Sequence, residues 1–467
     1  MRGMAISPSP KLEYGGHSEE ALEMVADDTI AALSTPPGEG AIAVVRISGP
    51  DAWQIADEIF RGDSIQPRRA MYGRIVDRDG TVDDVVLTAY RAPASYTGED
   101  VIEISGHGGV LVSARVLQTA LAAGARAALP GEFTQRAFLN GKMDLTQAEA
   151  VMDLIRAQTP LAARAAMEQL RGRIGEEILA IRESLLDVVA HIEAYIDFPD
   201  EDIAPDTGAA MRARMLAVRD RISALLATAD EGRILREGVR LAICGRPNAG
   251  KSSLLNRLVG FERAIVSPIP GTTRDTIEEV LSLRGIPFRV IDTAGLRETP
   301  DAIEREGVRR AREAVESADV VLRVIDSTEL ESLDDPSAAE NEIVVLNKID
   351  LSTDVPALKS RFPEALTASC ITGLGIPELI DGIASRVRMP SVARCESLAA
   401  INARHQSCLL RAMASLEAAI ARFDDGIEPE FISIDLRAAL DAAGEVVGVV
   451  DTEDILGRIF SSFCIGK

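Results

Sequence analysis

Apolar and polar residues alternate at short range through the first part of the chain, beginning near residue 29. A two-residue period is typical of strands that bury one face, and turn-forming residues separate the individual runs. The predicted strands cover residues 30–34, 41–47, 74–76, 85–89 and 100–105. Helical patterns cover residues 51–60 and run from the GHGG segment at 106–109 to Leu121. The pattern therefore predicts a mixed α/β domain that ends near Leu139.

A helical period replaces the strand pattern from about residue 146 to residue 233. Thr146 and Glu149 have the T-x-x-E spacing of a capping box and are expected to begin the first helix. The DFPD segment at 197–200 is expected to interrupt the run. The apolar stripes comprise Val151, Leu154, Ile155, Ile178, Ile181, Leu185, Val188, Ile192 and Tyr195. A second, mainly helical part of the chain is therefore expected.

Alternating strand and helix signals resume at Val239 and continue to about Arg388. The tail at residues 397–463 is helical again, but it is too small and one-sided to bury its own apolar face. The most economical packing lays these helices against the earlier ones, with the α/β segment inserted between two halves of one helical domain. The alternative is that the tail forms a separate interaction module.

Composition narrows the possible classes of protein. The 467 residues suffice for about three domains, and 46% hydrophobic residues are ordinary for a globular chain. The net charge of −23 argues against nucleic-acid binding driven by the charge of the whole protein. Any contact with nucleic acid therefore has to be local or made through a partner. Five cysteines without a C-x-x-C pair indicate neither a zinc site nor a disulfide framework, which fits the cytoplasm. No apolar run approaches the ~20 residues of a membrane helix, and the polar residues 1–27 are expected to form a disordered extension.

The segment GRPNAGKS at 245–252 fits the phosphate-binding P-loop pattern G-x-x-x-x-G-K-[ST]. An apolar strand pattern precedes it and a helical pattern follows it, which is the context that the motif requires. Glycines let the backbone approach the phosphates, the helix N-terminus binds them, and Lys251 adds a positive charge. Ser252 supplies a hydroxyl for Mg²⁺. A glycine-rich turn without function is the competing interpretation, and the strand-loop-helix context disfavours it.

Further motifs follow in the order that a GTPase requires. DTAG at 292–295 ends a predicted strand, where Asp292 can hold the Mg²⁺ shell and the Gly295 N–H can reach the γ-phosphate. NKID at 347–350 follows an apolar run, and a carboxylate there accepts both guanine donors, which adenine cannot supply. Ser369 and Cys370 lie where a base-supporting loop is expected. Together these elements predict GTP rather than ATP as the ligand.

The segment SPIPGTTRD at 267–275 lies between the first two motifs and is expected to act as a switch. Thr273 can place its hydroxyl on Mg²⁺ and its N–H on the γ-phosphate, while the two prolines stiffen the loop and leave carbonyls that could face a cation. Leu296 occupies the position at which Ras-like GTPases carry the glutamine that orients water. The acidic segment 298–304 is the nearest substitute, although chemistry alone favours solvated loop charges there.

Cys464 lies four residues from the end of the given sequence. The spacing resembles a prenylation box, but a terminal Lys is not a usual acceptor. A thiol beside Lys467 can be reactive. Packing of Cys464 as a small apolar residue with Phe460 and Phe463 is an equally good interpretation.

The whole chain from about residue 28 resembles the MnmE (TrmE) family of tRNA-modification GTPases. The residues that carry the resemblance are TPPG at 35–38, RISG at 46–49, YTGED at 96–100, GHGG at 106–109, PGEFTQRAFLN at 130–140, DFPD at 197–200, the P-loop, GTTRD at 271–275 and GRIFSSFCIGK at 457–467. The ending is the most specific of these, because other P-loop GTPases with similar central motifs lack it.

The resemblance implies an α/β multidomain protein with three kinds of domain. An α+β folate-binding-like domain at 28–140 would mediate homodimerisation, and a discontinuous α-helical domain at 141–237 and 391–467 would carry an inserted Ras-like P-loop G domain at 238–390. The family works with the FAD-binding partner MnmG, in a heterotetramer, to add aminomethyl or carboxymethylaminomethyl groups at C5 of the wobble uridine of certain tRNAs. A tetrahydrofolate derivative, either 5-formyl- or 5,10-methylene-tetrahydrofolate, supplies the one-carbon unit, and FAD enters only through the partner.

The motifs and the resemblance together define the expected nucleotide contacts, GTP or GDP being the ligand. The GTP-binding residues are Asn248, Ala249, Gly250, Lys251, Ser252, Ser253, Ser267, Pro268, Ile269, Pro270, Gly271, Thr272, Thr273, Asp292, Thr293, Ala294, Gly295, Asn347, Lys348, Asp350, Ser369 and Cys370. The expected Mg²⁺ ligands are Ser252 and Thr273.

The resemblance also implies a potassium site and a folate site. The residues matching the family's K⁺ site are Asn248, Ser267, Ile269 and Thr272, and those matching its folate contacts are Arg46, Glu103, Lys142 and Lys467. The cation would take the role of an arginine finger by neutralising charge that develops on the phosphates. Glu304 matches the water-positioning glutamate, so the resemblance reverses the earlier interpretation of the acidic segment. Glu304 and Cys464 are the expected catalytic residues.

Two departures from the family pattern affect only details. Ser267 stands where Thr is common, and Cys370-Ile371 replaces Ala-Arg or Ala-Lys in the base loop. A ribosome-assembly GTPase shares the central motifs but would carry an RNA-binding module and basic flanks, neither of which is seen here. A non-catalytic, GTP-gated scaffold is the third hypothesis, because Leu296 cannot orient water.

Overall fold

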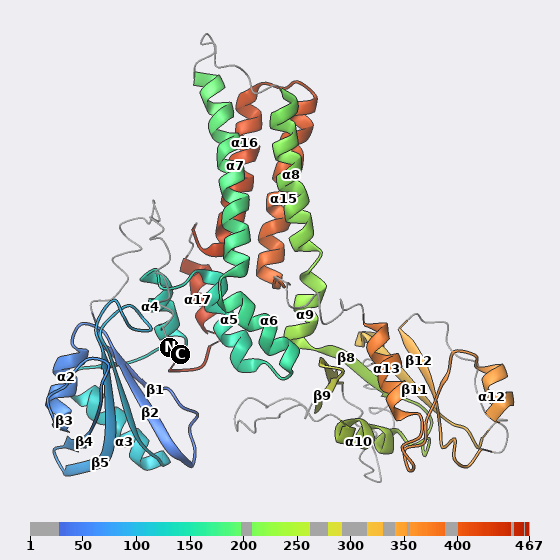
Figure 1. Ribbon diagram of the computed structural model, residues 1–467, viewed down its shortest axis with the longest axis horizontal. Helices are drawn as coiled ribbons and strands as arrows, with labels where there is room; N and C mark the ends of the chain where they lie inside the picture. Colours follow the sequence, from blue (N-terminus) through green and yellow to red (C-terminus); the bar gives the residue numbers. More distant parts are fainter. Residues whose placement is uncertain are drawn as a thin grey trace, which may run out of the picture. The chain divides into compact units, whose positions relative to one another are not determined.

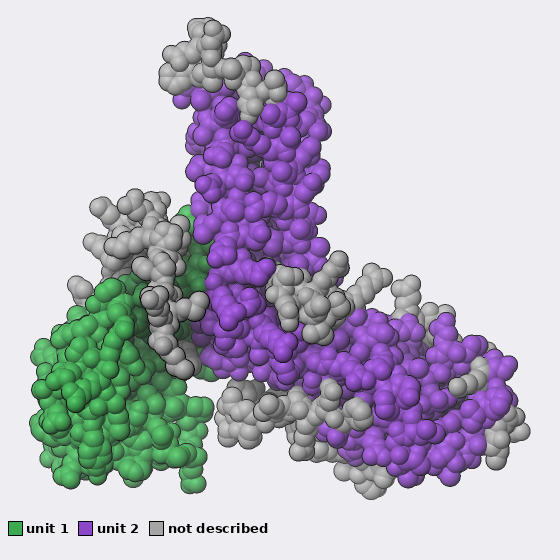
Figure 2. All heavy atoms as spheres, in the orientation of Figure 1, with its two compact units in different colours: residues 1–149, 444–467 green, residues 150–443 purple. Residues whose placement is uncertain are grey.

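The computed structural model describes residues 28–197, 208–261, 279–291, 315–329, 341–352, 355–387, 400–449, 453–461 and 463–466. The chain divides into two compact units, residues 1–149 with 444–467 and residues 150–443 (Figure 2). Each unit contains one sheet and several helices (Figure 1). The mixed α/β fold class predicted from the sequence is confirmed.

The sheet of the first unit has seven strands in the order β3-β4-β5-β6-β2-β1-β7. The strands are β1 (Ile30–Leu33), β2 (Gly40–Ser48), β3 (Phe60–Gly62), β4 (Ala70–Asp77), β5 (Gly80–Tyr90), β6 (Val101–Gly108) and β7 (Arg126–Ala127). Buried and exposed residues alternate along β4 and β5, as the two-residue period predicted. Most strand pairs are antiparallel, and Arg46 on β2 lies opposite Glu103 on β6.

One face of this sheet packs against two helices, because its core-facing side chains are apolar. Ile55 of α2 (Ala52–Ile59) and Val116 of α3 (Val110–Ala122) join Ile47, Leu87 and Ile102 in one buried cluster. The helix α4 (Glu132–Leu139) and the C-terminal helix α17 (Glu453–Ser461) pack against each other in the same unit.

The predicted start of the first helix in the mainly helical part, at Thr146, is wrong. The helix α5 runs over Leu145–Arg156, so Asp144 is its N-cap residue. The Asp144 carboxylate accepts a hydrogen bond from the Gln147 backbone N–H at 2.9 Å, and the Gln147 side chain accepts one from the Asp144 N–H at 2.9 Å. The reciprocal box is thus Asp144 with Gln147, whereas the Thr146 hydroxyl donates to Asp144. The sequence contains two such pairs shifted by two residues, and Asp is as good an N-cap as Thr.

Long helices form a bundle in the second unit. Its helices include α6 (Pro160–Leu170), α7 (Arg173–Asp197), α8 (Gly208–Leu226), α9 (Ala229–Glu237), α15 (Ala403–Asp424) and α16 (Pro429–Val447). The C-terminal helix α15 packs on α8, and the Glu193 carboxylate of α7 accepts a hydrogen bond from the Arg437 side chain of α16 at 2.6 Å (Figure 1). The predicted packing of the tail against the earlier helices is therefore confirmed, and the separate-module alternative is wrong.

The sheet of the second unit has six strands in the order β13-β12-β11-β8-β10-β9, all parallel to their neighbours except β9. The strands are β8 (Val239–Cys244), β9 (Glu279–Leu283), β10 (Ile286–Val290), β11 (Val320–Asp326), β12 (Glu342–Asn347) and β13 (Leu366–Thr367). The described helices of this part are α10 (Lys251–Phe261), α12 (Val355–Arg361) and α13 (Ile376–Arg386). Near-continuous apolar runs such as that of β8 are typical of parallel strands covered on both faces. The chain enters and leaves this sheet between helices of the bundle, so its strands lie within an insertion. The exact domain boundaries predicted above stay predictions.

Candidate nucleotide site and N-terminal ion pair

The P-loop connects the end of β8 with the first turn of α10, as predicted. Its backbone conformation demands particular residues, because Gly245, Asn248 and Gly250 have φ values of 144°, 63° and 95°. A Cβ atom at Gly245 would collide with the Val324 carbonyl, and one at Gly250 with the Asn347 side-chain amide. Asn tolerates the left-handed region better than most residues. The loop thus has the turned, glycine-dependent backbone that binds phosphates.

Lys251 lies at the first position of α10 and turns back over the loop. Its Nζ donates hydrogen bonds to the Gly245 and Arg246 carbonyls at 2.9 and 2.8 Å. Partial burial lowers the pKa of Lys251. Ser252 and Ser253 follow in the exposed first turn of the helix. A hydroxyl at Ser252 is therefore presented where a metal-bound phosphate would meet the helix N-terminus.

Asn347 joins the predicted base-binding motif to the P-loop. Its side chain is only 2% exposed, its Nδ2 donates to the Ala249 carbonyl at 2.9 Å, and its Oδ1 accepts from the Cys370 N–H at 3.3 Å. One buried amide thus holds three segments that are distant in sequence. The predicted phosphate and base motifs are brought together at the carboxyl ends of β8, β12 and β13 in one sheet, the edge where α/β sheets bind ligands.

Lys348 and Asp350 lie in the turn after β12. Lys348 has a left-handed φ of 62°, and its Nζ lies 2.5 Å from the Asp326 carboxylate at the end of β11. Burial alone would raise the pKa of Asp326, but hydrogen bonds from Lys348 and Thr328 hold that pKa below its usual range. Asp350 is exposed, as a base-accepting carboxylate has to be. Sequence reasoning missed Asp326, which no motif marks.

The remaining predicted nucleotide residues are partly outside the described structure. Ser369 is buried and its Oγ accepts from the Thr372 N–H at 3.1 Å, while burial raises the pKa of the half-buried Cys370 thiol. The predicted site residues that lie outside the described residues are Ser267, Pro268, Ile269, Pro270, Gly271, Thr272, Thr273, Asp292, Thr293, Ala294, Gly295, Glu304 and Lys467. The described half of the site therefore comprises the P-loop and the base motifs.

Arg46 and Glu103 form an ion pair on the face of the first sheet that α2 and α3 leave uncovered. The Arg46 guanidinium donates to Glu103 Oε1 from both Nε and Nη2, at 3.0 and 2.9 Å, and the two side chains are 15% and 27% exposed. The guanidinium also lies over two aromatic rings, 5.2 Å from the Tyr96 centroid and 5.5 Å from that of Phe133. Lys142 is exposed and its Nζ donates to the Pro93 carbonyl at 2.9 Å. The structure thus joins two of the predicted folate residues, Arg46 and Glu103, in one partly exposed ion pair beside two aromatic rings.

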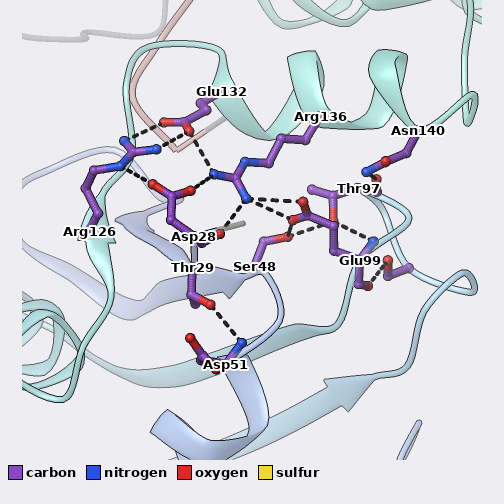
Figure 3. Close-up of polar contacts among 11 residues, drawn as sticks. Asp28, Thr29, Ser48, Asp51, Thr97, Glu99, Arg126, Glu132, Arg136 and Asn140 are labelled. Atoms are coloured by element: carbon purple, nitrogen blue, oxygen red, sulfur yellow. Dashed lines mark hydrogen bonds and ion pairs between the residues drawn. The ribbon is translucent and has the colours of Figure 1, made fainter. Parts of the chain in front are cut away.

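An ionic network around Arg136 lies close to this ion pair in the sequence motifs and was not predicted (Figure 3). The Arg136 side chain, only 5% exposed, contacts three carboxylates, at 2.5 Å from Asp28, 3.1 Å from Glu99 and 3.1 Å from Glu132. Glu99 also accepts a 2.6 Å hydrogen bond from Ser48. The network fixes the YTGED and PGEFT segments, which carry Tyr96 and Phe133. Charged residues inside these motifs were the only sequence signal, and a helix pattern cannot say which carboxylates meet one arginine.

A second arginine completes the network from the opposite side. Arg126 on β7 lies 2.6 Å from both Asp28 and Glu132. Burial alone would raise the pKa of Glu132, but hydrogen bonds from Arg126, the Leu129 N–H and Arg136 lower it. Three carboxylates and two guanidiniums thus share one cluster in which each buried charge has an opposite partner, as buried ions require.

The C-terminal segment returns to the start of α4. The Cys464 carbonyl accepts from the Gly131 N–H at 3.3 Å, Ile465 forms a bridge with Pro130, and the Ser34 hydroxyl donates to the Gly466 carbonyl at 3.0 Å. Phe460 and Phe463 are buried against each other, with ring centroids 5.3 Å apart, but Cys464 is exposed. The interpretation of Cys464 as a packing residue is therefore wrong, because the chain turns after Phe463 and points the thiol outward.

Among the described residues, no group of three or more His, Cys, Asp or Glu side chains could hold a metal ion. Within the same parts of the chain, no helix is both long and apolar enough to cross a membrane.

The sequence matches two protein families that together cover most of the chain. Residues 29–142 match the family described as GTP-binding protein TrmE N-terminus, and residues 145–464 match the MnmE helical domain. The chain belongs to the MnmE (TrmE) family of tRNA modification GTPases. The family predicted from the sequence and its GTPase class are thus confirmed, and the ribosome-assembly and scaffold alternatives fall away.

Individual relatives are similar in sequence to this chain over nearly their full length. The tRNA modification GTPase MnmE of Akkermansia muciniphila is 48% identical over 447 residues, which cover 94% of this chain and 99% of that protein. MnmE of Bacillus subtilis is 43% identical over 458 residues, covering 94% of this chain and 100% of that protein. Among solved structures, the G domain of the T. maritima FeoB iron transporter is 27% identical over 32% of this chain and 98% of that chain, with a TM-score of 0.24.

Proposed function

We propose that this chain is a K⁺-dependent GTP hydrolase that acts with an FAD-binding MnmG-type partner on tRNA. In this proposal a tetrahydrofolate derivative supplies a one-carbon unit, and the product carries an aminomethyl or carboxymethylaminomethyl group at C5 of the wobble uridine, position 34. The observation that carries the folate part is the Arg46–Glu103 pair at 2.9 Å, whose guanidinium lies over the rings of Tyr96 and Phe133. A donor and an acceptor side by side suit a planar heterocycle that offers both kinds of group.

The proposed folate contacts divide into a ring-binding and a tail-binding part. Glu103 accepts from pterin N–H groups and Arg46 donates beside it, with the rings of Tyr96 and Phe133 limiting access of water. Lys142, exposed on the same domain, and Lys467 offer positive charge to the folate carboxylates. Either 5-formyl- or 5,10-methylene-tetrahydrofolate fits this chemistry. The exposed Cys464 thiol is the proposed covalent residue of the tail.

The nucleotide half of the proposal assigns each residue a physical role. The P-loop backbone and Lys251 bind the phosphates, Asp350 reads the guanine edge, and Ser252 with Thr273 holds Mg²⁺. Asn248, Ser267, Ile269 and Thr272 hold K⁺. The cation supplies the charge neutralisation that an arginine finger supplies in other GTPases. Glu304 positions the attacking water.

The proposed assembly contains two copies of this chain. The N-terminal domains form a homodimer, the MnmG-type partner completes a heterotetramer, and FAD is bound by that partner alone. The compartment is the cytoplasm, in line with the cysteine thiols at Cys244, Cys370 and Cys464, which form no disulfide among the described residues.

The proposal is tested by nucleoside analysis of tRNA from cells that lack this protein. The C5 wobble modification should disappear and return with the wild-type gene, and Arg46→Met should fail to restore it. Arg74→Met is the matched control, because Arg74 also pairs across strands of the same sheet, at 3.0 Å from Asp84, but at an exposed site. Unchanged modification in the deletion strain would reject the proposed function. Full restoration by Arg46→Met would reject only the folate role of Arg46 and leave the rest of the proposal standing.

A further inference from the structure

Arg257 connects the P-loop helix with the base loop, by which we mean residues 369–374. The side chain rises from the second turn of α10, and its Nη2 donates a hydrogen bond to the Ile371 carbonyl at 2.8 Å. The two residues are 114 positions apart in sequence. The same helix carries Lys251 at its first position, so the contact joins the phosphate-binding and guanine-binding halves of the site.

The base loop is stiff internally. Within it, the Gly373 N–H donates to the Ser369 carbonyl at 2.9 Å and the Ser369 N–H donates to the Leu374 carbonyl at 2.8 Å. These two bonds close the loop upon itself. Its orientation toward the nucleotide therefore depends on what ties it to the rest of the domain.

Apolar packing does not hold the tip of the base loop against the rest of the domain. Ile371 and Leu374 are 78% and 64% exposed, although both are large apolar residues. On the strand side, the Cys370 N–H bonds to Asn347. On the helix side, the described contact is the guanidinium of Arg257.

The base loop passes close to the end of the Arg257 side chain at Gly373. Gly373 has a left-handed φ of 85°, and a Cβ atom there would lie 3.4 Å from Arg257 Nη2. The Arg257 Nε is buried and has no hydrogen-bond partner among the described residues, so the side chain has given up hydration to reach the loop. The guanidinium thus reaches the loop with one charged donor, Nη2, while its Nε is buried.

We propose that Arg257 is a positioning residue for guanine recognition. It holds the base loop against the helix that carries Lys251 and so prolongs the residence of guanine nucleotides. Asn347, at the end of β12, connects the P-loop with the base loop on the other side, through its hydrogen bonds with Ala249 and Cys370. Arg257 lies in the second turn of α10, beyond the P-loop, so in this proposal it acts on affinity and not on the chemical step.

The test measures release of fluorescent GDP from full-length Arg257→Ala by stopped flow. A hydrogen bond to a charged donor contributes enough to predict roughly tenfold faster release. The kcat at saturating GTP should stay within about twofold of wild type while KM rises, and Arg257→Lys should restore most of the slow release. Release from Arg257→Ala at the wild-type rate would overturn the proposal.

A second measurement separates positioning from mere stability of the helix. Competition against fluorescent GDP gives the affinities for GDP and ADP, and the preference for GDP over ADP should shrink severalfold in Arg257→Ala. An equal loss for both nucleotides would instead assign Arg257 to the phosphate half and overturn the proposal. Arg240→Ala is the matched control, because it removes an arginine–Asp319 contact at the opposite end of β8 and should leave both affinities unchanged. The outcome does not depend on potassium or folate, so it is independent of the proposed function.

Discussion

The Asn347 side-chain amide donates to the Ala249 carbonyl at 2.9 Å, which fastens the base-binding strand to the phosphate-binding loop. Gly250 makes the contact possible, since any Cβ there would occupy the place of the Asn347 amide. A direct hydrogen bond thus connects the phosphate-binding motif with the base-binding motif. This relationship leads to the first prediction.

Asn347→Asp replaces the donor with an acceptor that faces the Ala249 carbonyl. We expect a loss of about 1–3 kcal/mol in the free energy of unfolding, because the carbonyl loses its donor and a carboxylate is buried instead. GDP affinity should fall as well, measured by calorimetry. Asn341→Asp is the control, since Asn341 donates to the Ala318 carbonyl at 3.1 Å at the other end of β12 and its loss should spare GDP binding. Equal GDP affinity in Asn347→Asp would contradict the bridge.

Hydrolysis of GTP should be markedly faster in KCl than in NaCl, because the proposed cation takes the place of an arginine finger. Asn248→Gly should abolish the difference. Glycine tests the side chain alone, since Asn248 has a φ of 63°, where alanine would add about 1 kcal/mol of backbone strain. Equal rates in the two salts for the wild-type protein would remove the potassium site from the proposal.

Glu304→Ala should reduce kcat to near the detection limit while leaving GTP affinity nearly intact, because a water-positioning carboxylate acts in the transition state. Single-turnover hydrolysis and nucleotide titration measure the two quantities. Asp301→Ala, in the same acidic segment, is the matched control and should remain active. If both variants turn over normally, Glu304 is an ordinary solvated loop charge.

Asp350→Asn should shift nucleotide preference from guanine toward xanthine. The carboxylate accepts from two guanine donors, whereas an amide suits the carbonyl that xanthine presents at the same edge. Competition between GDP and xanthosine diphosphate measures the change. Retained preference for GDP would mean that the exposed Asp350 does not read the base.

His107 should titrate above the ordinary imidazole pKa of 6.5, because its Nδ1 lies 2.7 Å from the Asp83 carboxylate, and Asp84 adds a smaller attraction. The raised pKa means that the His107–Asp83 pair contributes fully to stability below pH 6.5 and loses this contribution as pH rises through the folded pKa. NMR titration of the four histidines measures the value, and Asp83→Asn should lower it. An unchanged His107 pKa in Asp83→Asn would rule out the carboxylate as the cause.

The nucleotide-binding motifs and the buried arginine contacts show which features short motifs can predict and which they cannot. The P-loop and NKID segments could be placed from sequence because each needs special backbone or donor chemistry within a few residues. Arg126, Arg136 and Arg257 could not be assigned, since their partners lie far away in the chain and no local pattern selects them. The Asp144–Gln147 cap was missed because an equally good pair lies two residues further on.

The sequence by itself determined the family, the GTPase class and the succession of strand and helix patterns, because periodicity and short motifs are local properties. Only the tertiary structure decided which charges meet. It paired Arg46 with Glu103, exposed Cys464 beside buried Phe463, and joined Ala249, Asn347 and Cys370 through one amide. The physical reason is that ion pairs and buried hydrogen bonds depend on distances between residues far apart in the chain, which the folded backbone alone sets.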